Sequence, residues 1–195
     1  MSKIKELLKD EESVLVFDVD GVLALMEWGE YNHYNDCDEV WNKICEKGIN
    51  TYTEDKVSKK MQEFLKDKDM TRCYVITTVG TNNETKFKKQ YVEKYYNIPS
   101  ENVYYVEKNS KKINELKKIK KSYPELEDYK IVMIDDTVEI LTDIMLNTSF
   151  STAHISSFLD IWKRRQSGQI SPIPFDIFLL IFFACYDIKK LKGGR

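Results

Sequence analysis

Two aspartates follow a short apolar run near the start of the chain. Residues 14–17 read Val-Leu-Val-Phe, which is typical of a strand buried inside a parallel sheet, and Asp18 and Asp20 come directly after it. Residues two apart in an extended chain leave the same face, so the two carboxylates would lie side by side. A cation or a shared proton relieves the repulsion between such carboxylates. Taken alone, the stretch also fits a strand end with an Asp-Gly turn at Gly21.

A second apolar run ends in acids much later in the chain. Residues 129–134 lead directly to Asp135 and Asp136, and Thr137 follows. In isolation, an Asp-Asp-Thr helix cap would explain this feature. In a parallel sheet, however, ligands bind beside the carboxyl ends of the strands, and both acidic pairs stand at such ends. We therefore expect residues that are distant in the chain to converge on one small pocket.

Residues 17–23, Phe-Asp-Val-Asp-Gly-Val-Leu, resemble the first signature of the haloacid dehalogenase-like (HAD) superfamily of phosphohydrolases. The run that ends at Asp135 and Asp136 resembles the fourth signature, which completes the family's metal site. The resemblance extends over about residues 14–155, with the second and third signatures between these two.

The second family signature is an apolar strand that ends in Thr or Ser, whose hydroxyl holds a phosphoryl oxygen. Residues 73–78, Cys-Tyr-Val-Ile-Thr-Thr, resemble it and precede a polar loop. Thr77 is the better match and Thr78 the alternative. The same pattern also fits an ordinary strand, because β-branched residues are common in strands.

The third family signature requires one lysine that points at the phosphoryl group. Lys108, Lys111 and Lys112 all stand in the corresponding region. Lys112 fits best because an apolar helical residue, Leu116, lies one turn beyond it. Lys108 and Lys111 remain open, since this helix is rich in lysines that would mostly form a solvated face.

The resemblance implies a Mg²⁺ site at the acidic strand ends. Mg²⁺ prefers hard oxygen ligands and retains several waters, which suits the carboxylates of Asp18 and Asp135 with the backbone carbonyl of Asp20. Asp136 would be a water-mediated or orienting ligand.

The resemblance also implies a mechanism for cleaving phosphate monoesters. Asp18 would attack phosphorus to form an aspartyl phosphate, and Asp20 would protonate the leaving oxygen and later accept a proton from water. Thr77 and Lys112 would stabilise charge on the transferring group. Family branches that cleave carbon–halogen bonds generally lack the second acid, so Asp20 favours phosphate esters. The expected activity is that of a phosphoric monoester hydrolase, a HAD-like phosphatase.

Apolar runs that alternate with helical patterns predict an α/β fold. Strands are expected at residues 14–17, 73–78, 102–106, 129–134 and 151–155. They would form a Rossmann-like parallel sheet of about five strands with helices on both faces. His154 lies within the last strand, and we interpret it as structural.

Helical spacing of apolar residues predicts the helices between these runs. Thr53 is the expected start of one helix, and Thr81 with Glu84 forms a capping box for the next. The predicted buried stripes are Val57, Met61, Phe64 and Leu65 in the first of these, Phe87, Tyr91, Val92 and Tyr95 in the second, Ile113, Leu116 and Ile119 in a third, and Val138, Leu141 and Met145 in a fourth.

The length of 195 residues suits one α/β domain with a small embellishment. We expect a HAD-like catalytic domain over residues 1–165, in which residues 22–70 form a flap and helical insert too short for a full cap domain. Residues 166–195 would form a linker and an apolar helix that packs on the domain or in a homodimer interface. In the family, an open site often accompanies large substrates, but a small nucleotide or sugar phosphate under the aromatic flap also fits.

Composition limits the partners and the compartment. Lys and Arg number 30 against 32 Asp and Glu, so a net charge of −2 gives no general attraction to nucleic acid or anionic membranes. The 4 cysteines show no Cys-x-x-Cys spacing, which argues against zinc and for reduced thiols in the cytoplasm. The first residues lack the apolar stretch of a signal peptide, and the apolar stretch at 175–188 is too short for a membrane span.

Two alternatives accompany the phosphohydrolase interpretation. A nucleic-acid-end or nucleotide phosphatase of the same fold gains a local argument from the lysine-rich helix that begins near Lys112. A non-catalytic HAD-like interaction module would keep the fold and bind a partner through the apolar C-terminal segment. The expected partner of the enzyme itself is a phosphorylated substrate, either a small molecule or a macromolecule.

Overall fold

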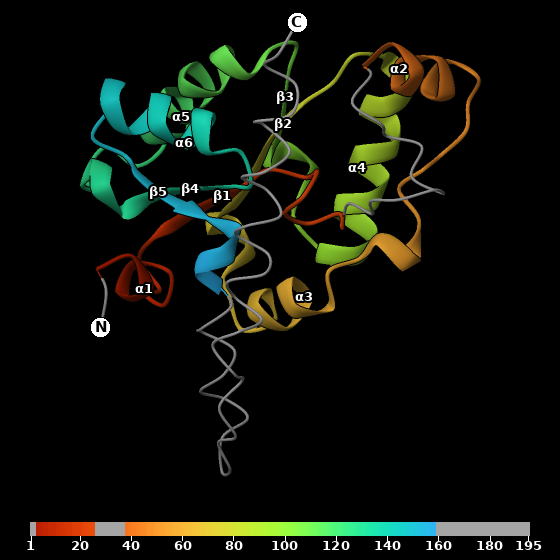
Figure 1. Cartoon of the computed structure of the whole chain (residues 1–195). Coiled ribbons are helices and arrows are strands. Elements are labelled where there is room, and N and C mark those ends of the chain that lie inside the picture. Colours follow the sequence, from red (N-terminus) through yellow and green to blue (C-terminus); the bar gives the residue numbers. More distant parts are fainter. Residues whose placement is uncertain (1–2, 26–37, 159–195) are drawn as a thin grey trace, which may run out of the picture. The chain divides into compact units, whose positions relative to one another are not determined.

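Each of the expected apolar runs forms a strand of one parallel sheet (Figure 1). The computed structural model describes residues 3–25 and 38–158, and within them the strands are β1 (Val14–Phe17), β2 (Cys73–Thr78), β3 (Val103–Val106), β4 (Ile131–Asp135) and β5 (Ser151–His154). All neighbouring strands in the order β3-β2-β1-β4-β5 pair in parallel. The predicted Rossmann-like α/β fold is therefore confirmed.

The strand order places a topological switch point between β1 and β4. From β1 the chain proceeds outward through β2 to β3, then crosses to the other side of β1 to form β4 and β5. Ligands of open α/β sheets bind at the carboxyl ends of strands at such a point. Asp18 follows β1 directly and Asp135 ends β4, so both predicted acidic ends lie at this position.

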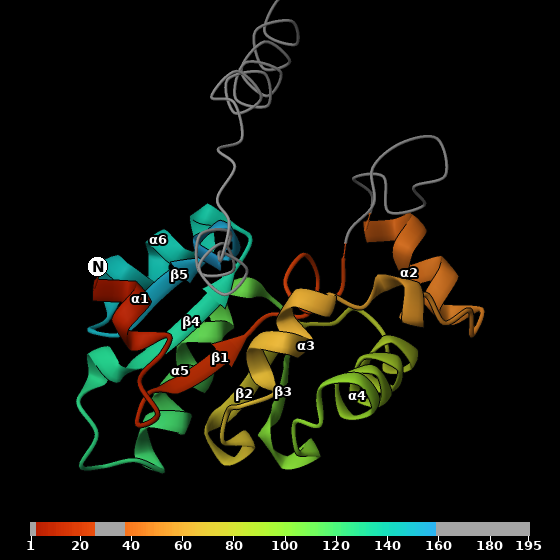
Figure 2. The same cartoon turned by 90° about the horizontal axis from the view of Figure 1, so that it is seen from below.

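Helices cover both faces of the sheet (Figures 1 and 2). On one face lie α5 (Lys112–Lys121) and α6 (Val138–Asn147), whose apolar side chains share a buried cluster with Val16 and Met133 of the sheet. On the other face lie α1 (Lys3–Leu7), α3 (Lys59–Leu65) and α4 (Asn82–Tyr96), and α2 (Asp38–Glu46) packs against α4. Among the described residues, no helix is both long and apolar enough to cross a membrane.

The insert between β1 and β2 begins its second helix later than predicted. Thr53 makes no capping hydrogen bond, and only the 3₁₀ turn Glu54–Lys56 follows it. Val57 is extended and forms a β-bridge with Ala24, which keeps the chain out of a helix at that point. The cap of α3 is instead Ser58, whose side chain accepts a hydrogen bond from a backbone amide in the first turn.

The buried faces of two helices differ in part from the prediction. In α4, Tyr96 is buried in place of Tyr95, because its hydroxyl donates a hydrogen bond to the backbone of the loop after β1. In α6, Leu141 is buried as expected, but Val138 and Met145 are exposed. The stripe that faces the sheet runs instead through Ile140, Leu141 and Ile144, and the two exposed positions, seven residues apart, lie on its flank.

The predicted divisions of the chain concern segments that are only partly described. The described residues all belong to a compact unit of residues 1–161, which includes α2 and α3 of the predicted insert. Residues 26–37 of the predicted flap lie outside the described residues, as does the predicted C-terminal helix within 166–195. The flap and the dimer interface therefore remain predictions.

Candidate functional site

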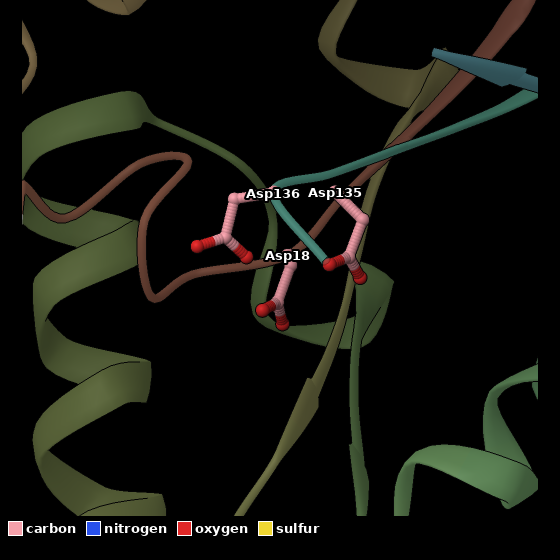
Figure 3. A group of neighbouring side chains, drawn as sticks. All are labelled: Asp18, Asp135 and Asp136. Carbon is pink, nitrogen blue, oxygen red and sulfur yellow. The ribbon is translucent and has the colours of Figure 1, made fainter. Parts of the chain in front are cut away.

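The two predicted acidic strand ends meet at the switch point (Figure 3). Phe17 of β1 is paired with Ile134 of β4. The residues that follow them, Asp18 and Asp135, therefore lie next to each other on adjacent strands. One carboxylate oxygen each from Asp18, Asp135 and Asp136 lies within 4.8 Å of the others. Asp18 and Asp135 are buried, whereas Asp136 is exposed.

Asp18 is a buried carboxylate with an incomplete set of partners. Lys112 Nζ lies 3.2 Å from Asp18 Oδ1 as an ion pair, yet within the described part of the chain this oxygen accepts no well-aligned hydrogen bond. Burial raises the pKa of Asp18 to about 6; the ammonium of Lys112 opposes this effect and the charge of Asp135 adds to it. A further cation beside Asp18 would relieve this cost.

Of the three candidate lysines, Lys112 reaches the acids. It opens α5, its side chain is 1% exposed, and its ammonium donates a hydrogen bond of 2.8 Å to Asp135 Oδ2. Burial alone would lower the pKa of Lys112, but the carboxylates of Asp18 and Asp135 raise it. Lys111 instead pairs with Glu107 on the surface, and Lys108 is exposed.

The two threonines at the end of β2 have different surroundings. Thr77 is fully buried, and its Oγ1 accepts a hydrogen bond of 3.1 Å from Lys88 Nζ. Thr78 is only partly buried, and its hydroxyl donates to Asn109 Oδ1 at 2.5 Å. Lys88 also contacts Asp20, so the structure joins the hydroxyl of Thr77, rather than the hydroxyl of Thr78, to the acidic pair after β1.

Sequence reasoning missed Lys88 of α4, a second buried lysine. Its Nζ lies 2.6 Å from Asp20 Oδ2 and 2.9 Å from Glu84 Oε1, and its side chain is 1% exposed. Burial would lower the pKa of Lys88, but the carboxylates of Asp20 and Glu84 raise it. A signal was present in the sequence, because Glu84 and Lys88 are four residues apart and in phase with the buried stripe of Phe87 and Tyr91.

Glu84 explains why the predicted capping box is only half formed. The cap itself is present, since Thr81 Oγ1 accepts a hydrogen bond of 3.1 Å from the Glu84 amide. The Glu84 side chain, however, turns inward to Lys88 and accepts a hydrogen bond of 2.8 Å from the Gly80 amide. The buried lysine is a stronger partner for this carboxylate than the backbone amide of Thr81.

The insert contributes Tyr52, which was also not predicted. Its hydroxyl donates a hydrogen bond of 3.0 Å to Asp20 Oδ1, and its ring is packed edge-on against Trp41 of α2, with centroids 5.8 Å apart. Nothing in the local sequence distinguishes Tyr52 from the other tyrosines, because its partner Asp20 is remote in the chain.

Gly21 and His154 fix the position of Asp136. Gly21 has a φ of 73°, and a Cβ there would lie 2.0 Å from Asp136 Oδ2, so only glycine leaves room for this carboxylate. His154 Nδ1 accepts a hydrogen bond from the Ser156 amide, which leaves Nε2 to donate to the Asp136 carbonyl at 2.9 Å. The contact agrees with the structural role predicted for His154.

The site residues could hold a small, hard divalent cation. Three carboxylates face one another with a single lysine, Lys112, between two of them, so the group retains excess negative charge. The poorly paired Oδ1 of Asp18 offers a lone pair to an ion. Asp20 directs its carboxylate toward Lys88 and Tyr52, which leaves its backbone carbonyl as its expected ligand atom. Such an all-oxygen set fits Mg²⁺.

Comparisons with known proteins identify no family. No family model matches the sequence, and no curated protein matches it. Among solved structures, one similar chain is that of DsGPDH of Dunaliella salina, which shares 14% sequence identity with this chain and gives a TM-score of 0.46. The match covers 78% of this chain and 25% of that one, so this chain spans about a quarter of the similar protein.

Proposed function

We propose that the chain is a Mg²⁺-dependent phosphohydrolase of the HAD type, which cleaves phosphate monoesters through an aspartyl phosphate on Asp18. The observation that carries this proposal is the convergence of Asp18, Asp135 and Lys112 at the switch point, with Asp20 on the same loop. The resemblance of residues 17–23 to the first HAD signature supports it further.

The first step transfers the phosphoryl group to Asp18. A bond forms between a carboxylate oxygen of Asp18 and phosphorus while the bond from phosphorus to the leaving oxygen breaks. Asp20 gives its proton to that oxygen, which departs as an alcohol. Asp18, Asp135, Asp136 and the Asp20 carbonyl would hold a Mg²⁺ ion, whose charge would offset that of the phosphoryl oxygens.

The second step releases phosphate. A water oxygen bonds to phosphorus, its proton passes to Asp20, and the bond between phosphorus and Asp18 breaks, so both acids return to their starting forms. Lys112 offsets the charge of the Asp18 and Asp135 carboxylates, and the hydroxyl of Thr77 donates to a phosphoryl oxygen.

The proposed setting is the cytoplasm. Cys45 and Cys73 are free, buried thiols, which agrees with a reducing compartment. The proposed partner is a phosphorylated substrate that enters at the carboxyl ends of the strands.

A panel of phosphate esters tests the proposed function. Phosphate release from p-nitrophenyl phosphate, nucleotides, sugar phosphates and end-phosphorylated oligonucleotides is measured with and without Mg²⁺. We expect Mg²⁺-dependent release that Asp18→Asn lowers by at least about 1,000-fold, because the nucleophile is lost. Asp143→Asn, which changes an exposed carboxylate of α6, is the matched control and should retain full activity. Equal turnover by Asp18→Asn and the parent protein would refute the mechanism.

A further inference from the structure

We propose that Lys88 is a positioning residue that, with Glu84 and Tyr52, fixes the carboxylate of Asp20 and orients the hydroxyl of Thr77. The consequence is a substrate class: phosphate esters of ordinary alcohols, whose leaving oxygen requires a proton. This inference rests on the proposed function and deepens it.

The hydrogen-bond capacity of Lys88 is fully used inside the protein. Its Nζ lies 2.6 Å from Asp20 Oδ2, 2.6 Å from the Thr78 carbonyl, 2.9 Å from Glu84 Oε1 and 3.1 Å from Thr77 Oγ1. An ammonium has three hydrogens, and here four acceptors compete for them. With all three hydrogens engaged by these acceptors, none is left for a substrate phosphate. Lys88 therefore acts through its neighbours and not on the phosphoryl group itself.

Asp20 is fixed from both sides. Lys88 contacts Oδ2, and the hydroxyl of Tyr52 donates to Oδ1 at 3.0 Å. Glu84, 4% exposed, lies 2.9 Å from Lys88 Nζ and offsets part of its buried charge. With both oxygens held, the carboxylate of Asp20 stays at the strand end and does not swing between rotamers.

The contact with Lys88 also sets the direction of the hydrogen bond at Thr77. An ammonium only donates, so Thr77 Oγ1 must accept. The hydroxyl hydrogen of Thr77 then points to another acceptor, and a phosphoryl oxygen at the strand ends is the acceptor that the proposed function supplies. Without Lys88, this hydroxyl would be free to rotate.

The arrangement around Asp20 matters most for poor leaving groups. A carboxyl group passes a proton to the leaving oxygen efficiently only when it is held in place beside that oxygen, and Lys88 and Tyr52 hold both oxygens of Asp20. An alkoxide needs that proton to depart, whereas p-nitrophenolate departs without it. The benefit of Lys88 should therefore appear mainly with alkyl esters.

A leaving-group comparison tests the inference. We measure kcat/KM, which reports the steps up to departure of the leaving group, for ethyl phosphate and p-nitrophenyl phosphate. Lys88→Met should lower the value for ethyl phosphate by about 100-fold or more, but that for p-nitrophenyl phosphate by about 10-fold or less. Tyr52→Phe keeps the buried ion pairs and should also lower kcat/KM more for ethyl phosphate than for p-nitrophenyl phosphate, although by a smaller factor. This variant provides the test if Lys88→Met does not fold.

The controls separate this inference from the proposed function. Lys89→Met changes an exposed lysine of the same helix and should leave both values unchanged. Equal losses on the two esters in Lys88→Met and in Tyr52→Phe would overturn the role of the network while Asp18→Asn still abolishes turnover. Undiminished activity in Asp18→Asn would instead overturn the proposed function, and an inactive parent protein would overturn both.

Discussion

Asp18, at the end of β1, lies in surroundings that lower stability but suit the proposed chemistry. Asp18 is buried beside Asp135, and one of its oxygens has no well-aligned hydrogen bond within the described residues. Such an arrangement costs stability in the absence of a cation, because buried carboxylates repel one another and lose their hydration. It is useful if a metal ion and a phosphoryl group occupy the site.

Replacing Asp18 with Asn should stabilise the metal-free protein. The substitution removes a buried, poorly paired charge and leaves Lys112 paired with Asp135 at 2.8 Å. We expect a gain of about 1 kcal/mol, or about 2–4 °C in Tm, at neutral pH in the presence of a chelator. Thermal unfolding measures it, with Asp143→Asn as the control. A Tm below that of the parent protein would contradict the interpretation of Asp18 as a buried, poorly paired charge.

Gly21 and Gly48 form a matched pair for testing the support of Asp136. Both have positive φ, 73° and 75°, but a Cβ at Gly48 meets nothing within 4 Å, whereas one at Gly21 meets the Asp136 carboxylate. Gly48→Ala should cost about 1 kcal/mol from the backbone alone.

Gly21→Ala should cost more than that and also weaken Mg²⁺ binding, because Asp136 must move. Calorimetric titration with Mg²⁺ and thermal unfolding of both variants measure the difference. Equal stability and equal Mg²⁺ affinity in the two variants would show that the contact with Asp136 is unimportant.

At the scale of elements, the start of α3 depends on one serine. Ser58 caps this helix through a hydrogen bond of 3.3 Å from the Met61 amide, whereas Thr53 makes no capping bond. Ser58→Ala should therefore destabilise the protein by about 1 kcal/mol, and Thr53→Ala by clearly less. Urea unfolding of the two variants checks this. A larger loss in Thr53→Ala would restore the helix start predicted from the sequence.

Elements also differ in how far the sequence predicts them. The strands β1, β2 and β4 were predictable because apolar runs end abruptly at acids or at Thr77. The acids of the site were predictable from their place after strands, together with the resemblance to the HAD signatures, whereas the choice of Lys112 over Lys108 and Lys111 required the structure. Lys88 and Tyr52 were not predicted, because their roles come from contacts with Asp20, which lies far from both in the chain. Local periodicity indicates the pairing of Lys88 with Glu84 on the same helix, but it carries no information on the remote partner Asp20.

At the scale of the whole described unit, the site draws on both faces of the sheet. Lys112 comes from α5 on one face and Lys88 from α4 on the other, and each pairs with an acid that follows β1. The insert adds Tyr52 from a third direction. The site is therefore complete only when the layers are assembled, which links folding of the unit to its chemistry.

The reactivity of the buried thiols Cys45 and Cys73 tests how tightly the described unit is packed. Burial, with the charge of Glu84, raises the pKa of Cys45 to about 11, and burial raises that of Cys73 to about 12. Because of its raised pKa, the Cys45 thiol stays almost entirely neutral at pH 8, and roughly one molecule in a thousand would carry the reactive thiolate. In a Cys37→Ser/Cys185→Ser chain, iodoacetamide should label the native protein at least about 100-fold more slowly than the unfolded one, and faster with rising pH. Rapid labelling at pH 8 would contradict the packing of α2 and β2.

Phosphoryl transfer at Asp18 is tested most directly by the thermal shift of the whole chain with Mg²⁺ and beryllofluoride. Beryllofluoride mimics a phosphoryl group on an aspartate, so the test requires no knowledge of the substrate. A ligand that binds only the native state must raise its stability. We expect the two together to raise Tm by several degrees more than Mg²⁺ alone, and we expect Asp18→Asn to abolish the additional shift while Asp143→Asn keeps it. No additional shift, or one that persists in Asp18→Asn, would contradict phosphoryl transfer at Asp18 and favour a non-catalytic role for the fold.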